Sequence, residues 1–127
     1  MKFNKLIPEL SVRDINKSKI FYCNVLEFKV SYERIEDKFV FLSFEGSQIM
    51  LEQFNNTWTV GELIYPSGRG INLQIETKNI QKIYASLNDN NIKTFKDLVI
   101  SEYKVNNDLY KEHEFLVQDP DGYLLRF

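Results

Sequence analysis

Apolar and polar residues alternate along the chain in an order that predicts two copies of one supersecondary unit. Period-two alternation indicates strands, and apolar residues three and four apart indicate helices. In the first half this gives a strand, a helix and three strands, at residues 6–12, 14–26, 28–34, 39–44 and 48–54. A strand at 71–75 and a helix from Asn79 to about residue 90 repeat the start of this order, and strands from residue 92 onward complete it.

Residues at the element ends support this division. Asp14 and Asn79 each precede an apolar-periodic run, as helix-capping residues do, and they lie 65 positions apart. Pro8 stands inside the first strand and has no N–H to donate, so we expect this strand at a sheet edge. Residues 28–34 should place Phe28, Val30 and Tyr32 on one face of a strand.

The closing residues 115–127 predict a hairpin. Two apolar runs flank Asp119-Pro120-Asp121-Gly122, in which proline presets φ, the aspartates can bond nearby backbone and glycine allows positive φ.

We therefore predict an α+β domain over residues 1–127, built from two βαβββ modules at 6–54 and 71–127. The linker loop 55–70 is rich in Gly, Pro, Asn and Ser and carries Trp58 and Tyr65. Three short strands after one helix cannot be covered by that helix alone. We therefore expect the two modules to build one curved mixed sheet around a shared cleft.

Composition narrows the function classes. The chain has 127 residues, is 43% hydrophobic and carries a net charge of −2, which argues against nucleic acid as the partner. No apolar run approaches the ~20 residues of a membrane span, and the first residues do not form a signal peptide, so we expect no membrane partner and a cytoplasmic protein. Cys23 is the single cysteine, which excludes an internal disulfide and a cysteine-based metal site.

Several motifs in this order resemble the vicinal oxygen chelate superfamily, which includes glyoxalase I, extradiol dioxygenases, and fosfomycin and bleomycin resistance proteins. They are residues 8–14 (Pro-Glu-Leu-Ser-Val-Arg-Asp), Phe21-Tyr22, residues 25–28 (Val-Leu-Glu-Phe) and the ending 119–127. Glu27 stands where the superfamily usually has glycine. The resemblance covers nearly the whole chain, and loop 55–70 is the least covered part.

The resemblance implies where a metal enzyme of this superfamily would hold its ion. The four ligand positions, usually His and Glu, fall on Ile7, Glu52, Asn72 and Arg126. Isoleucine offers no donor atom and arginine would repel the cation, and His113 cannot rescue the site alone. We therefore expect no metal, no cofactor and no catalytic residues.

Among the superfamily, the chain is most similar to the bleomycin resistance proteins. This resemblance implies a metal-free, non-catalytic homodimer that sequesters a bleomycin-type glycopeptide antibiotic or similar small molecule in clefts at its interface and so confers resistance. Pro8 would be the hinge of an N-terminal strand exchanged between the chains. Two alternatives stay open: a metal-dependent lyase, isomerase or thiol transferase, and a binding protein with another natural ligand.

A large cationic ligand with flat rings needs aromatic faces and carboxylates. The aromatic candidates are Phe39, Phe54, Trp58 and Tyr110. The acidic candidates are Glu36, Asp37 and Glu52. A carboxylate on an apolar strand is costly without a partner, so we also expect Glu52 to pair with Arg126 inside the cleft.

Overall fold

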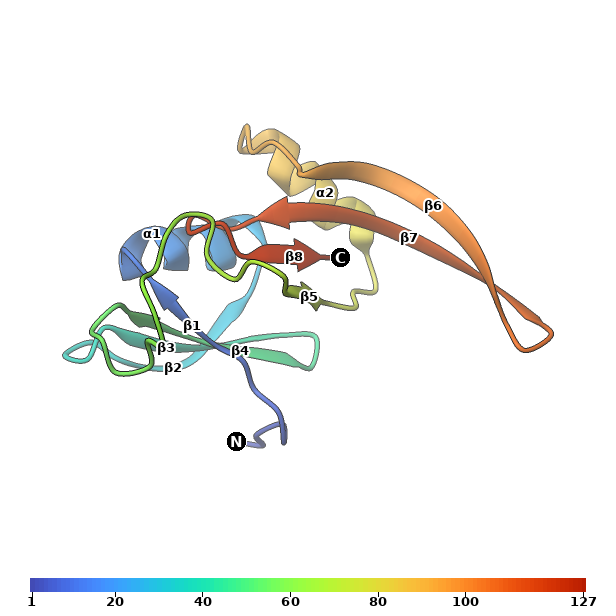
Figure 1. Cartoon of the computed structure of the whole chain (residues 1–127). Helices are drawn as coiled ribbons and strands as arrows, with labels where there is room; N and C mark the ends of the chain where they lie inside the picture. Colours follow the sequence, from blue (N-terminus) through green and yellow to red (C-terminus); the bar gives the residue numbers. More distant parts are fainter.

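The computed structural model describes residues 1–127 as two modules that each contain a helix and a four-stranded sheet (Figure 1). The first module contains β1 (Glu9–Val12), α1 (Ile15–Lys19), η1 (Ile20–Val25), β2 (Lys29–Arg34), β3 (Phe39–Phe44) and β4 (Ser47–Gln53). The second contains β5 (Asn72–Gln74), α2 (Ile80–Asp89), β6 (Lys96–Val105), β7 (Asp108–Gln118) and β8 (Leu124–Arg126). The predicted α+β class and the two βαβββ modules are confirmed.

The first sheet has the strand order β1-β4-β3-β2 and the second has the matching order β5-β8-β7-β6. In each sheet the module's first strand pairs in parallel with its last, and the remaining pairs are antiparallel. The strands form two separate sheets, whereas we expected one curved sheet. Strand β1 lies at an edge, as Pro8 predicted, and begins directly after the proline.

Strand β1 pairs with β4 of the same chain, and the N–H of Met50 donates to the carbonyl of Pro8 at 2.9 Å. The residues before Pro8 also contact their own chain. The Asn4 N–H donates to Gln48, and the ring of Phe3 packs edge-on against Phe41. Exchange of the N-terminal strand between two chains therefore stays a prediction.

The predicted helix 14–26 is present, with the Asp14 carboxylate accepting from the N–H groups of Asn16 and Lys17. It begins as α1 and widens into the π-helical turn η1. One hydrophobic core of 20 buried residues draws on both modules, from Leu10 and Val12 in β1 to Leu125 in β8. Neither module therefore buries its apolar face alone.

The prediction that Phe28, Val30 and Tyr32 share one face of the strand was wrong. Val30 lies opposite Leu42 whereas Tyr32 lies opposite Phe41, because the register shifts between them. Leu42 and Phe41 are neighbours on β3 and point to opposite faces. The bulge therefore sends Tyr32 to the face away from the core, where its ring stacks on Phe41.

The long hairpin of β6 and β7 was not predicted as one element. We expected a strand from residue 92 and a polar stretch at 106–108, but residues 96–118 form two long strands joined at Asn106-Asn107. The hairpin projects well beyond the rest of the molecule (Figure 1). Most of its side chains are exposed on both faces, so the alternation that indicates a half-buried strand is absent.

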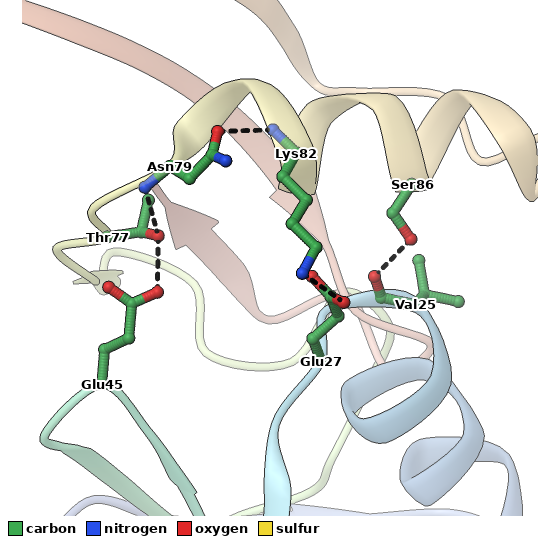
Figure 2. Close-up of polar contacts among 7 residues, drawn as sticks. All are labelled: Val25, Glu27, Glu45, Thr77, Asn79, Lys82 and Ser86. Carbon is green, nitrogen blue, oxygen red and sulfur yellow. Dashed lines mark hydrogen bonds and ion pairs between the residues drawn. The ribbon is translucent and has the colours of Figure 1, made fainter.

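A set of polar contacts joins the two modules (Figure 2). The Glu45 carboxylate, in the turn between β3 and β4, accepts from the Lys78 N–H at 2.7 Å and the Thr77 hydroxyl at 2.8 Å, just before α2. The Ser86 hydroxyl on α2 donates to the carbonyl of Val25 at 2.6 Å. The second module's helix is thus fixed against the first module. None of the helices is both long and apolar enough to cross a bilayer.

Candidate ligand-binding site

The face of the first sheet that points away from the core carries an unusual mixture of aromatic and charged residues. We call it the open face. Strand register places on it Glu9, Tyr32, Arg34, Phe39, Phe41, Met50 and Glu52. The residues between them, such as Leu10, Val40 and Leu51, lie in the core. Strand β3 is buried along nearly all its length, which explains why its phenylalanines did not alternate with polar residues.

At one end of the open face, a hollow of about 470 Å³ collects five of the predicted contact residues. The turn after β2 contributes Glu36 and Asp37, and the end of β4 contributes Glu52 and Phe54. Trp58 comes from the loop that follows and is 65% exposed. Three carboxylates, two aromatic side chains and one cation, Lys38, therefore line one small volume. We call this volume the acidic hollow.

Phe39 lies beside the acidic hollow but is only 4% exposed. The Arg34 guanidinium covers its ring, 4.0 Å from the centroid, and Arg34 Nε is 3.0 Å from the Asp37 carboxylate. A cation therefore already rests on this ring and is held by an acidic side chain. Phe39 reaches a ligand only if Arg34 moves, and sequence reasoning did not identify Arg34 as its cover.

Two carboxylates lie close together on neighbouring strands of the open face. Glu9 on β1 lies opposite Met50 on β4, and Ser11 lies opposite Glu52. Glu9 and Glu52 are therefore diagonal neighbours, two residues apart in register. One Glu9 carboxylate oxygen is buried and accepts no hydrogen bond. Burial, and then the nearby Glu52 charge, raise the pKa of Glu9, while Arg34 opposes the shift. The site therefore favours a positive charge in front of these residues.

Sequence reasoning did not identify Glu9. It follows Pro8 in a short strand and entered the sequence analysis only as part of the family motif. The sequence did hold a signal for it. Glu9 lies two residues after Ile7, one of the superfamily's ligand positions, and residues two apart on a strand share a face. Glu9 and Trp58 also line a second hollow of about 260 Å³, so Trp58 stands between the two.

Two predicted residues do not join this site. Tyr110 lies on the β6–β7 hairpin, where its ring stacks on Tyr103 at 5.7 Å. Arg126 lies on β8 in the second sheet. Its guanidinium donates to the side-chain oxygen of Gln74 at 2.9 Å and lies 3.8 Å from the Glu114 carboxylate. The expected ion pair between Glu52 and Arg126 is not formed in the chain. Instead, Asn55 Nδ2 donates to the Glu52 carboxylate at 3.0 Å.

The residues at the superfamily's metal positions do not fit a divalent ion. Ile7 has no donor atom, and Arg126 is a cation that already has a carboxylate partner in Glu114. No three His, Cys, Asp or Glu side chains of the chain lie together in a way that could hold a metal. We therefore assign no metal-dependent step to these residues.

Comparison with known proteins agrees with the architecture. A family model described as "Glyoxalase-like domain" matches residues 4–125. A glyoxalase/bleomycin resistance protein/dioxygenase superfamily member from Vibrio splendidus 12B01 is 35% identical and covers 94% of this chain and 92% of its own. Its TM-score of 0.43 is too low for structural argument. No curated protein matches the chain.

Two further structures share the fold. The glyoxalase/bleomycin resistance protein/dioxygenase from Alicyclobacillus acidocaldarius is 22% identical, with a TM-score of 0.65, and the match covers 98% of this chain and 89% of that one. TioX from Micromonospora sp. ML1 is 13% identical, with a TM-score of 0.75 and coverage of 98% and 97%. At these identities the likeness supports the fold alone.

Proposed function

We propose a function from the premise that the chain belongs to the glyoxalase/bleomycin resistance/dioxygenase superfamily, as the family match over residues 4–125 shows. Within it, the chain is a non-catalytic binding protein that sequesters a cationic small molecule with a flat ring system. A bleomycin-type glycopeptide antibiotic has this chemistry, and its capture would confer resistance. A different natural ligand of the same chemistry fits the same residues.

The acidic hollow is the observation that carries this proposal. Glu36, Asp37 and Glu52 supply three negative charges against the one positive charge of Lys38. Phe54 and Trp58 supply exposed ring faces in the same volume. Cations bind favourably over aromatic rings and beside carboxylates. The contact of Arg34 with Phe39 and Asp37 displays this chemistry inside the chain itself.

We also infer that the binding form is a homodimer. The β6–β7 hairpin supports this proposal, because it exposes large apolar side chains on both of its faces. One face carries Val99, Tyr103, Val105 and Tyr110, and the other carries Ile100 and Leu109, each exposed by 45% or more. Exposed apolar surface of this kind marks an interaction site in a folded protein. A second copy would enlarge the hollow into a cleft long enough for a glycopeptide.

Calorimetric titration of the chelator-treated protein with metal-free bleomycin tests the binding proposal. We expect saturable binding at one drug per chain. The double variant E36Q/E52Q should weaken binding by about tenfold or more, because charged hydrogen bonds and ion pairs to the ligand are lost. The variant D89N on α2 removes an exposed charge away from both the hollow and the hairpin, and should bind as the wild type does.

Equal affinity of the wild type and E36Q/E52Q would contradict the assignment of the acidic hollow. The absence of any binding would contradict a bleomycin-type ligand.

A further inference from the structure

One hollow of the molecule is separate from most of the proposed site. It measures about 770 Å³, within the range of small-molecule pockets. It lies where the ends of β1 and β4 meet the loop of residues 56–63 and the closing turn at Asp121. It shares only Gln53 and Phe54 with the acidic hollow. We call it the junction hollow, because both modules contribute to its wall.

Arg13 supplies the unpaired positive charge of the junction hollow. Its side chain forms no ion pair in the chain, and its guanidinium lies 5.6 Å from the centre of the Tyr65 ring. Asp121 also lines the wall, but it is 3% exposed and accepts from the backbone N–H of Arg13 at 2.9 Å. The backbone of Arg13 is therefore fixed while its guanidinium stays available to an anion.

One residue of the junction hollow holds a polar group without a partner. The hydroxyl oxygen of Thr59 is buried and forms no hydrogen bond in the chain, so it meets a ligand only if the side chain turns toward the hollow. A hydroxyl can donate to a carboxylate oxygen, so it can serve the same anionic group as a guanidinium. Burying a polar group without a partner is unfavourable, which makes a ligand at Thr59 stabilising.

The rest of the wall is partly apolar. Phe54 and Leu63 are 44% and 40% exposed, so their side chains would lose water contact when a ligand enters. Glu62 and Asp121 put two carboxylates in the lining beside the one guanidinium of Arg13, which disfavours ligands with more than one anionic group. The chemistry of the wall therefore selects an apolar body that bears a single acid group.

We propose that the junction hollow binds a small amphipathic carboxylate, with its acid group at Arg13 and Thr59 and its apolar part against Phe54 and Leu63. The ligand proposed for this site carries the opposite charge to the one proposed for the acidic hollow. Its existence does not depend on the function proposed above, and the two can be tested in one protein sample.

Three probes of equal size separate the two sites: 4-phenylbutyrate, its neutral amide 4-phenylbutanamide and the cation 4-phenylbutylamine. Affinities come from NMR titration of the isotope-labelled full chain. We expect the carboxylate to bind about tenfold or more tightly than the amide, since hydrogen bonds to a charged group are the stronger kind. Its backbone shifts should lie at Arg13, Gly61 and Ser67. Shifts from the amine should instead lie around Glu52.

The variant R13Q should remove the preference for the carboxylate over the amide and leave weak binding of both. The side chain of Arg13 is exposed and its N–H is kept, so the variant should fold, as an unchanged spectrum elsewhere would verify. K17Q, which removes an exposed charge on α1, should keep the preference. Three results would each overturn the proposal. They are equal affinity of the carboxylate and the amide in the wild type, a preference for the carboxylate that survives in R13Q, and backbone shifts from the carboxylate that are confined to the region of Glu52.

Discussion

At the scale of single residues, the closing turn contains the most perturbed acid of the chain. Asp119 is 3% exposed and accepts from the Tyr22 hydroxyl at 2.7 Å and from the N–H groups of Asp121 and Tyr123. Burial raises the pKa of Asp119 to about 6, although these hydrogen bonds oppose the shift. In the sequence, residues 119–122 resembled an ordinary hairpin turn. In the structure, this turn also joins the modules, because Asp119 of the second module bonds Tyr22 in η1 of the first.

This pKa sets a pH dependence of stability. An unfolded aspartate has a pKa of about 3.9, so between that value and about 6 the folded state holds the proton more tightly. The free energy of unfolding should therefore fall as pH rises through this window, by up to about 3 kcal/mol from this group.

Urea denaturation at pH 4 to 7 of the wild type and D119N measures this effect. The amide oxygen that D119N introduces can still accept from the two backbone N–H groups, so the variant should fold. The difference in stability between the two proteins should change across the window, because titrating groups away from Asp119, such as Glu9, cancel. Parallel curves would show that Asp119 does not titrate there.

Glu27 shows a second residue-scale effect. It adopts φ = 67°, in the left-handed region, and its carboxylate is 3.3 Å from Lys82 Nζ on α2. The left-handed conformation costs an ordinary residue roughly 1–2 kcal/mol, whereas an exposed ion pair contributes about 0–1 kcal/mol.

We therefore expect E27G to leave the free energy of unfolding unchanged or to raise it by about 1 kcal/mol. Chemical denaturation checks this, with K82Q as the control that removes only the ion pair. A loss of more than about 2 kcal/mol in E27G would mean that the ion pair outweighs the backbone strain.

At the scale of elements, the turn between β3 and β4 is bonded to the residues that lead into a helix of the other module. Glu45 accepts from Thr77 and Lys78 immediately before α2, and Asn79, the N-cap, then accepts from the Lys82 N–H at 3.1 Å (Figure 2). Removing hydrogen bonds to an exposed carboxylate costs about 1–2 kcal/mol.

We expect E45A to lower the free energy of unfolding by about 1–2 kcal/mol and to speed hydrogen exchange in α2 before other elements. The matched control is E36A, which removes a glutamate from the turn of the neighbouring hairpin, away from α2. Equal effects of the two variants on α2 exchange would contradict the role of Glu45 in holding the start of α2.

The elements that sequence could predict were those with a local signal. Asp14 and Asn79 mark the two helix starts, and Pro8 marks an edge strand. The bulge between Val30 and Tyr32 has no local signal, because cross-strand packing of Tyr32 on Phe41 determines it. The β6–β7 hairpin was missed for a related reason: its exposed faces lack the period that burial imposes.

At the scale of the whole molecule, the predicted site residues divide by sheet. Those from the first module converge because the turn at Glu36 and the end of β4 are neighbours on one sheet. Tyr110 and Arg126 belong to the second sheet, and sequence reasoning had placed all of them in one shared cleft. Sequence alone predicts which strand a residue lies on, but not how two separate sheets are placed.

The proposed homodimer makes a direct prediction. Sedimentation equilibrium at micromolar concentration should give twice the chain mass of 15.1 kDa. L109D, which puts a charge on the exposed hairpin, should give the single-chain mass, because burying that charge at an interface is unfavourable. K104Q is the control on the same hairpin. A wild type that sediments as a single chain would contradict the dimer.

The most direct test of metal-independent ligand capture uses the single tryptophan. Trp58 lines the acidic hollow, so its fluorescence reports occupancy during a titration of chelator-treated protein with metal-free bleomycin. We expect a saturable change at one drug per chain, with the same affinity before and after chelation. No change in fluorescence and no binding, together with one divalent ion per chain before chelation, would contradict metal-independent capture and favour a metal enzyme.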